Sequence, residues 1–200
     1  TDEFLRRLKE AVARLSEVTL TREELEYMTK HCRFLPGVYW EWLSSFRFRP
    51  DKIDISLDKD RHLSIEITDY LYKATLYEVP LLAIVSEIKN QVLGNVADMD
   101  DIICKLSEKV TLSNEHRLSF SEFGTRRRFS FDVQDKVIDC LKQTAHYCTG
   151  TSNCHFAMKY GLKTMGTHPH EWFMFHGAQF GYKHANYMAL ENWVNVYDGD

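Results

Sequence analysis

Glu122-Phe123-Gly124-Thr125-Arg126-Arg127-Arg128 overlaps the end of a predicted strand, Leu118–Phe123, and carries charged groups directly beyond it. Gly124 lets the backbone turn sharply or approach a ligand closely. In an extended chain, Arg126 and Arg128 share one face and Arg127 takes the other. The planar fork of arginine suits carboxylates and phosphates. A solvated basic turn is the ordinary alternative, but the carboxyl end of a strand is where α/β proteins build their sites.

A second junction lies at Gly150-Thr151-Ser152-Asn153, a predicted turn that leads into a helix over Cys154–Tyr160. Free backbone amides and the positive end of a helix dipole can bind an anion there. Ordinary capping of the helix by Ser152 or Asn153 is the alternative, and for this stretch alone it is the better explanation.

A third junction, Gly166-Thr167-His168-Pro169-His170-Glu171-Trp172, ends a short predicted strand over Lys163–Thr167 and opens a helix at Pro169. Histidine can act as a base, a metal ligand or a nucleophile toward phosphorus. A helix N-terminus disfavours the cation, so a neutral imidazole is available for attack. A buried structural histidine is the alternative. Together the three junctions offer an arginine cluster, an amide-rich turn and a histidine, which suits a multiply phosphorylated substrate.

The predicted pattern of helices and strands differs between the two halves of the chain. Thr21 and Glu24 form a capping box, and Ile53, Ile55 and Leu57 begin a period-two alternation. The first half is predicted to hold helices over 2–15, 21–31 and from Pro36, hairpin strands at 53–57 and 63–67, a further strand over 70–77, and helices from Pro80 and over 98–110. In the second half, helices over 132–145 and 154–160 alternate with strands, which is typical of parallel βα units and an α/β fold. A closed barrel needs eight strands and about 250 residues, so a barrel here would be unfinished.

Composition excludes several classes of protein. The 200 residues are 44% hydrophobic and carry a net charge of −4, which supports a real core and argues against a general nucleic-acid binder. The five cysteines are odd in number and show no C-x-x-C spacing, so we expect reduced thiols and a cytoplasmic protein rather than a disulfide framework. We expect no signal peptide, no membrane span and no membrane partner.

The three junctions resemble those of the nicotinate phosphoribosyltransferase family, closest to its bacterial type. The resemblance lies in residues 123–130, in Gly150-Thr151-Ser152-Asn153, and in Gly166-Thr167 followed by His170-Glu171-Trp172. Weaker likeness covers nearly the whole chain. The implied fold is an α+β N-terminal domain at 1–113, incomplete at its start, and then the first βα units of an irregular type II phosphoribosyltransferase barrel at 114–200, incomplete at its end. The chain would therefore be an internal piece of the enzyme.

The resemblance also implies a reaction. Family members join nicotinate to phosphoribosyl pyrophosphate in NAD biosynthesis, with ATP hydrolysis through a phosphohistidine and with Mg²⁺, and they are commonly homodimers. His170 matches the phosphorylated histidine, and Arg126 is the second expected catalytic residue. Substrate contacts are expected from Gly124, Thr125, Arg126, Arg128, Ser152, Asn153 and Thr167. No residue is assigned to a metal.

Three alternatives remain open in the sequence. A nicotinamide-specific relative would share the chemistry. A metallohydrolase could use the His168/His170 pair, with His176 as a third zinc ligand. A non-catalytic piece is the third, since the isolated 200 residues are expected to be inactive without the missing strands. One departure from the family also stands out: Pro169, preceded by His168, replaces the small residue usual before the histidine.

Overall fold

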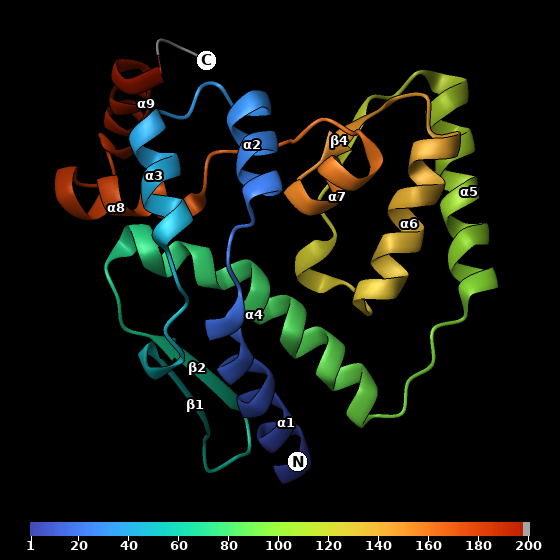
Figure 1. The fold of residues 1–200 in the computed structure, drawn as a ribbon, viewed down its shortest axis with the longest axis horizontal. Coiled ribbons are helices and arrows are strands. Elements are labelled where there is room, and N and C mark those ends of the chain that lie inside the picture. The colour runs from blue at the N-terminus through green and yellow to red at the C-terminus, as the bar shows by residue number, and fades with distance from the viewer. Residues whose placement is uncertain (198–200) are drawn as a thin grey trace.

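The computed structural model describes residues 1–197, and its first half matches the predicted order of helices up to the hairpin (Figure 1). Helix α1 (Asp2–Ala13) runs on into a 3-10 turn, η1 (Arg14–Glu17), and is followed by α2 (Arg22–His31) and α3 (Gly37–Ser45). The predicted capping box is present, because the Glu24 amide donates to Thr21 Oγ1 at 3.2 Å and the Thr21 amide donates to Glu24 Oε2 at 2.8 Å. These three helix predictions are confirmed.

The predicted hairpin is also confirmed. A 3-10 turn, η2 (Pro50–Lys52), leads into β1 (Ile53–Leu57), which pairs antiparallel with β2 (Leu63–Ile67). Asp58 shapes the turn, since its Oδ1 accepts the amide N–H groups of Asp60 and His62 at 2.9 and 2.8 Å.

The structure corrects the prediction for residues 70–92. The expected strand over 70–77 and the expected helix start at Pro80 are both wrong, because a single helix, α4, spans Leu71–Val92 with Pro80 inside it. Proline inside a helix removes one hydrogen bond and costs about 3 kcal/mol. Burial of Tyr77, Leu81 and Ile88 on one side of the helix outweighs that cost. Helix α5 (Met99–His116), capped by Asp98, is longer than predicted.

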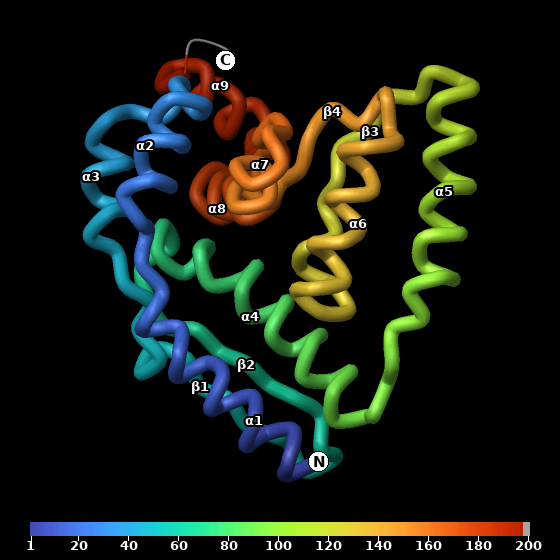
Figure 2. Tube along the Cα trace, turned by 45° about the vertical axis from the view of Figure 1, so that its right-hand side comes forward, coloured from blue at the N-terminus to red at the C-terminus, as the bar shows by residue number. Residues whose placement is uncertain are grey.

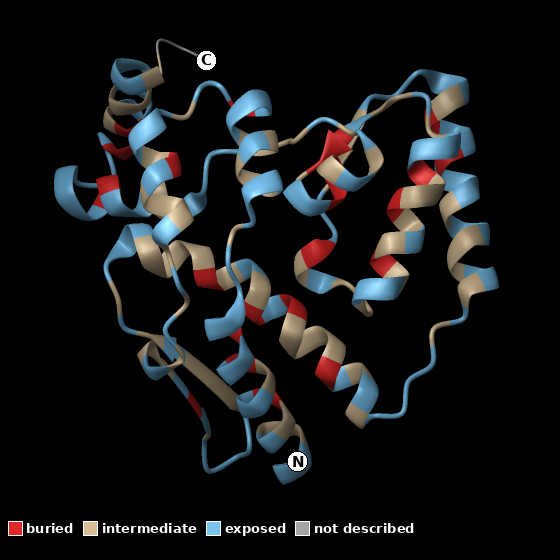
Figure 3. Cartoon of the chain, in the orientation of Figure 1, coloured by how far each residue is buried: buried red, intermediate tan, exposed pale blue. Residues whose placement is uncertain are grey.

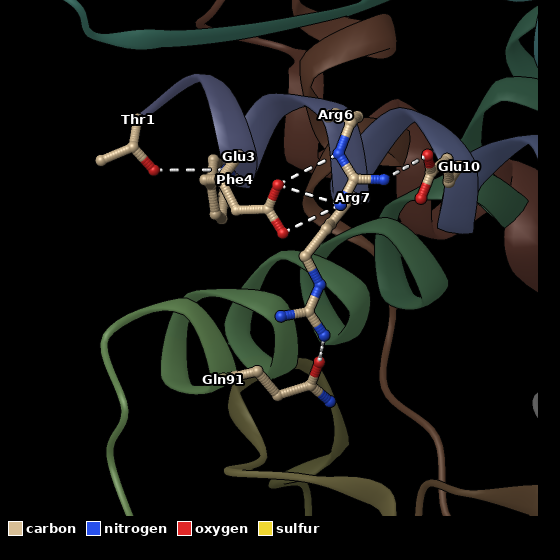
Figure 4. A network of polar contacts seen from close by, with 7 residues as sticks. All are labelled: Thr1, Glu3, Phe4, Arg6, Arg7, Glu10 and Gln91. Carbon is tan, nitrogen blue, oxygen red and sulfur yellow. Dashed lines mark hydrogen bonds and ion pairs between the residues drawn. The ribbon is translucent and has the colours of Figure 1, made fainter.

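The main core lies where α4 packs on α1 and the hairpin (Figure 2). Figure 3 shows buried residues recurring along α1 and α4. The buried members of this core are Leu8, Val12, Leu15, Ile55, Tyr77, Leu81 and Ile88. At the edge of the contact, Arg7 Nη2 donates to Gln91 Oε1 at 2.5 Å and so ties α1 to α4 (Figure 4).

The second half is built from parallel βα units, as predicted. Its elements are β3 (Phe120–Glu122), the 3-10 turn η3 (Thr125–Arg127), α6 (Phe131–Thr144), β4 (Cys148–Thr151), α7 (Cys154–Tyr160), α8 (His170–Phe180) and α9 (Ala185–Tyr197). Strand β3 pairs parallel with β4, and an isolated parallel bridge joins Thr151 to Thr164. The expected strand over Lys163–Thr167 is therefore wrong in extent, since its parallel pairing is limited to hydrogen bonds on either side of Thr151.

The α/β fold class is confirmed. Helix α4 crosses between α1 and the hairpin on one side and the parallel strands on the other, while α5 and α6 lie side by side on the outer flank (Figures 1 and 2). Across residues 1–197, no helix combines the length and the apolar character needed to cross a membrane.

Gly150, in β4, allows the segment around Lys163 and Thr164 to pair closely with that strand. A Cβ atom at Gly150 would lie 2.2 Å from the Lys163 carbonyl oxygen. We predict that Gly150→Ala lowers the free energy of unfolding by at least about 2 kcal/mol, because backbone must move to relieve the clash. Gly37→Ala is the matched control, since nothing lies within 4 Å of its added Cβ. Urea unfolding of both variants checks the prediction, and equal stabilities would contradict it.

Candidate functional site

The parallel strands bring the first two junctions together. The Ser152 amide donates to the Glu122 carbonyl at 2.9 Å. Asn153 Nδ2 donates to Thr125 Oγ1 at 3.1 Å, and Thr125 is only 8% exposed. The two stretches predicted to bind substrate therefore form one continuous surface at the carboxyl ends of β3 and β4.

The Glu122 carboxylate holds this surface together. Its Oε2 accepts from Thr151 Oγ1 at 2.7 Å, and its Oε1 accepts from Gln134 Nε2 at 2.8 Å and from the Gly124 amide. With three donors already in place, Glu122 serves to position the turn rather than to act as a base. Glu122 is not among the residues predicted to bind substrate, and its donor Thr151 lies 29 residues away in the chain.

The arginine triplet is not extended, contrary to the expectation. Residues 125–127 form a 3-10 turn in which the Arg127 amide donates to the Gly124 carbonyl at 3.0 Å. Arg126 and Arg128 nevertheless both reach α4, where they pair with Glu78 and Glu87, and Arg127 is exposed.

Arg128 is the more deeply held of the two. Its side chain is 16% exposed, its Nη2 lies 3.2 Å from Glu87 Oε2, and its guanidinium lies over the Phe131 ring at 5.3 Å. Arg128 Nε is buried without a hydrogen-bond partner among the described residues. These contacts are with the protein itself, and its predicted substrate contact stays a prediction.

Helix α4 grips the segment after the arginines through three polar side chains, which we call the α4 clamp: Ser86, Glu87 and Asn90. The Ser86 hydroxyl donates to the Arg128 carbonyl at 2.8 Å, and Asn90 Nδ2 donates to the Phe129 carbonyl at 3.1 Å. Glu87 also accepts the Phe131 amide at 3.1 Å. The clamp fixes the path of the chain into α6.

The second junction is a strand end with a helix cap, because Gly150 and Thr151 belong to β4. Asn153 caps α7 by accepting the Phe156 amide at 3.1 Å, as the capping alternative expected. The Ser152 and Asn153 amides already donate to Glu122 and Thr151. These two amides are therefore not free to bind an anion, and an anion at this junction would be bound by side chains instead.

Helix α7 is anchored on α6 through Asp135. Lys159 Nζ lies 2.6 Å from Asp135 Oδ2, and Tyr160 Oη lies 2.8 Å from Oδ1. Burial tends to raise the pKa of Asp135, but the hydrogen bonds from Lys159 and Tyr160 bring it below the ordinary value overall. The stabilisation is therefore present above an unfolded pKa of about 3.9 and is lost as the pH falls through the lower folded pKa.

His170 is the first residue of α8, directly after Pro169. Its side chain is 66% exposed, and its Nε2 lies 2.9 Å from Glu171 Oε1. Within residues 1–197, Glu171 is its one polar side-chain partner, so the structure does not join His170 to Arg126 or Asn153.

Thr167 and His168 lie in the wall of a cavity of about 1070 Å³ between α2, α3, α7 and α9. The His168 ring packs edge-on against Trp193, with ring centroids 4.3 Å apart. Both histidines of the H-x-H pair are exposed, but their surroundings differ: His168 packs against Trp193, and His170 lies beside Glu171.

His176 is not available as a third zinc ligand. It is 1% exposed, its Nδ1 lies 2.7 Å from the Trp172 carbonyl oxygen, and its Nε2 lies 2.9 Å from Asn192 Nδ2. A carbonyl only accepts, so Nδ1 carries the proton and Nε2 accepts from the amide. In the described part of the chain, the group with metal-ligand spacing is Asp58, Asp60 and His62, exposed in the hairpin turn and outside the three junctions.

The five cysteines, all within the described residues, are free thiols, as expected. Removal from water raises the pKa of the Cys148 and Cys154 thiols. Both therefore stay protonated at neutral pH, and neither is an activated nucleophile.

Comparisons with known proteins agree over most of the chain. A model of the nicotinate phosphoribosyltransferase N-terminal domain matches residues 1–86, and a model of the nicotinate phosphoribosyltransferase family matches residues 118–200. A nicotinate phosphoribosyltransferase of Chromohalobacter salexigens is 42% identical over 199 residues, covering 98% of this chain and 51% of the relative. One from Methanosarcina acetivorans is 37% identical over 216 residues, covering 100% and 53%.

Solved structures give the same answer. The nicotinate phosphoribosyltransferase of Porphyromonas gingivalis superposes with a TM-score of 0.96 at 45% identity, covering 100% of this chain and 52% of that one. A putative nicotinate phosphoribosyltransferase of Saccharomyces cerevisiae gives a TM-score of 0.90 at 29% identity, with the same coverages. The chain spans about half the length of the curated relatives it matches.

Removal of the Glu122 carboxylate should loosen the surface that it holds. We predict that Glu122→Ala lowers the free energy of unfolding by about 2 kcal/mol or more, because three donors lose their acceptor. Glu122→Gln should cost less, since its remaining oxygen can still accept from Gly124 and Gln134. Glu108→Ala, an exposed change on α5, is the control and should stay within about 0.5 kcal/mol of wild type. Urea unfolding measures all three, and a Glu122→Ala variant as stable as the control would refute the role.

Proposed function

The chain belongs to the nicotinate phosphoribosyltransferase family, and from that premise we propose that the full-length protein joins nicotinate to phosphoribosyl pyrophosphate. The products would be nicotinate mononucleotide and pyrophosphate, in the salvage route to NAD. The curated relatives that it resembles carry this name. The N–C bond forms from the nicotinate ring nitrogen to the ribosyl C1 as the C–O bond to pyrophosphate breaks.

One observation supports this proposal most strongly: Thr125 and Asn153 are in contact beside Arg126 at the carboxyl ends of two parallel strands. The ribosyl centre becomes cation-like while negative charge grows on the leaving pyrophosphate. An enzyme for this step must hold two reactants in line and neutralise anionic oxygens. In the proposed site, Arg126 binds an anionic group. The residues that shape the surface around it are Thr125, Ser152, Asn153 and Gly124, the last of which adds no side chain to that surface.

Nicotinate is the proposed acceptor rather than nicotinamide. An arginine can hold a carboxylate with two parallel N–H···O bonds, whereas a neutral amide accepts through one oxygen only. Arg126 keeps 41% of its side chain exposed and so remains accessible to such a group.

His170 is the proposed phosphoryl acceptor from ATP. Glu171 Oε1, 2.9 Å from Nε2, favours the neutral tautomer that carries its proton on Nε2, which leaves the lone pair on Nδ1 for attack on the terminal phosphorus, with ADP as the leaving group. Its position at the start of α8 places the new phosphate at the positive end of a helix dipole. Hydrolysis of the phosphohistidine would then complete the ATP-coupled cycle. His170 and Thr167 would belong to this second part of the site.

Magnesium is proposed as a companion of the substrate phosphates. The acids that contact residues 124–128, namely Glu78, Glu87 and Glu122, are already hydrogen-bonded to protein groups. The described residues therefore offer no ready carboxylate cluster for the ion at this turn, and magnesium commonly reaches such sites on phosphate oxygens.

We predict that His170→Ala abolishes ATP coupling while leaving binding of nicotinate intact. With the nucleophile gone, ADP formation should fall roughly 100-fold or more. The assay incubates full-length protein with nicotinate, phosphoribosyl pyrophosphate, magnesium and ATP and follows nicotinate mononucleotide and ADP together, with nicotinamide in a parallel tube.

His146→Ala is the matched control, since His146 is exposed and lies outside the three junctions. It should keep ATP coupling at the wild-type level. Product from nicotinamide but not from nicotinate would overturn the proposed substrate. An unchanged ADP yield in His170→Ala would overturn the phosphohistidine.

A further inference from the structure

Two carboxylates on α4 meet the arginine turn, and they make different kinds of contact. Glu87 belongs to the α4 clamp, where it accepts from both the Arg128 side chain and the Phe131 amide. Glu78 lies outside the clamp. Among the described residues, its one polar side-chain contact is with Arg126 Nη1.

Arg126 is thereby fixed at its base and at its tip. At the base, the 3-10 turn begins at Thr125, which is buried and bonded to Asn153. At the tip, the contact with Glu78 occupies Nη1, and 41% of the side chain stays exposed. A guanidinium has five N–H donors in a rigid fork, so most of its capacity remains for a ligand.

Glu78 itself has little to do with folding. It is 33% exposed, and partly exposed ion pairs of this kind contribute little to stability. Ordering a long arginine side chain in advance, by contrast, spares its binding partner the loss of that side chain's freedom.

We propose that Glu78 is a positioning residue for Arg126: it holds the guanidinium by one nitrogen and so leaves the other N–H groups ordered for a phosphate or carboxylate. The inference rests on the proposed function, and it adds that Glu78 orients the arginine proposed to bind the anion. Competition is the opposite reading, in which the Glu78 charge must be displaced before an anion binds. If Glu78 positions Arg126, its removal raises KM; if Glu78 competes with the anion, its removal lowers KM.

The test uses the full-length protein and a double-mutant cycle of Glu78→Ala and Arg126→Ala. Glu78→Ala should raise KM about 10-fold for the substrate whose anionic group Arg126 holds, nicotinate or phosphoribosyl pyrophosphate, with a smaller change in kcat, because the guanidinium loses its orientation. Glu78→Gln, which keeps an oxygen acceptor of the same reach, should stay within about threefold of wild type. In the Arg126→Ala background, Glu78→Ala should have no further effect.

A lowered KM in both Glu78 variants would overturn the inference in favour of competition. An equal loss with and without Arg126 would overturn it in favour of a merely structural role. Glu115→Ala, an exposed carboxylate on α5, controls for loss of one negative charge and should leave KM unchanged.

Calorimetric titrations with nicotinate and, separately, with inorganic pyrophosphate distinguish this inference from the proposed function, since they need no turnover. Binding of either ligand that weakens about 10-fold in Glu78→Ala supports the positioning role even if the wild type makes no nucleotide from nicotinate. Failure of both ligands to bind the wild type, or unchanged binding of both in Glu78→Ala, overturns the role even if the wild type is active.

Discussion

Burial of one side of α4 is the constraint on which the rest of the structure depends. Tyr77 is completely buried, and its hydroxyl accepts the Arg49 amide at 2.9 Å. Phe46 and Phe48 pack edge-on against its ring, at centroid distances of 6.3 and 5.0 Å. The same helix presents Glu78 and the α4 clamp to residues 126–131. A core contact and the geometry of the site are therefore set by one rigid element.

Local signals in the sequence predicted the helices and strands that depend on interactions between neighbouring residues. The capping box at Thr21, the helix over Cys154–Tyr160 and the alternation around Ile55 all depend on neighbouring residues, and the structure has each of them. The start of α4 was missed for the opposite reason. Residues 70–77 are rich in aromatic and apolar groups that suit a strand, and only packing against α1 and the hairpin decides for a helix.

In the candidate site, too, some features could be predicted from the sequence and others depend on distant residues. Parallel strands place their carboxyl ends together, so the closeness of Thr125 and Asn153 followed from topology alone. The partners of Arg126 and Arg128 did not, because Glu78 and Glu87 lie 48 and 41 residues away in the chain. The role of Glu122 was also hidden, since its three donors come from α6, from β4 and from the turn after β3.

The two arginines show how a repeated residue can take distinct roles. Arg128 is largely buried and stacked on Phe131, and its partner Glu87 also holds the backbone, so this charge is balanced within the scaffold. A charge in that setting must remain paired, because an unpaired ion removed from water is costly. Arg126 has one partner and a large exposed fraction, so it can take on a second anion without leaving a buried charge behind. The difference arises from position: Arg126 lies within the 3-10 turn and contacts α4 only through Glu78, whereas Arg128 follows the turn and is held by the α4 clamp.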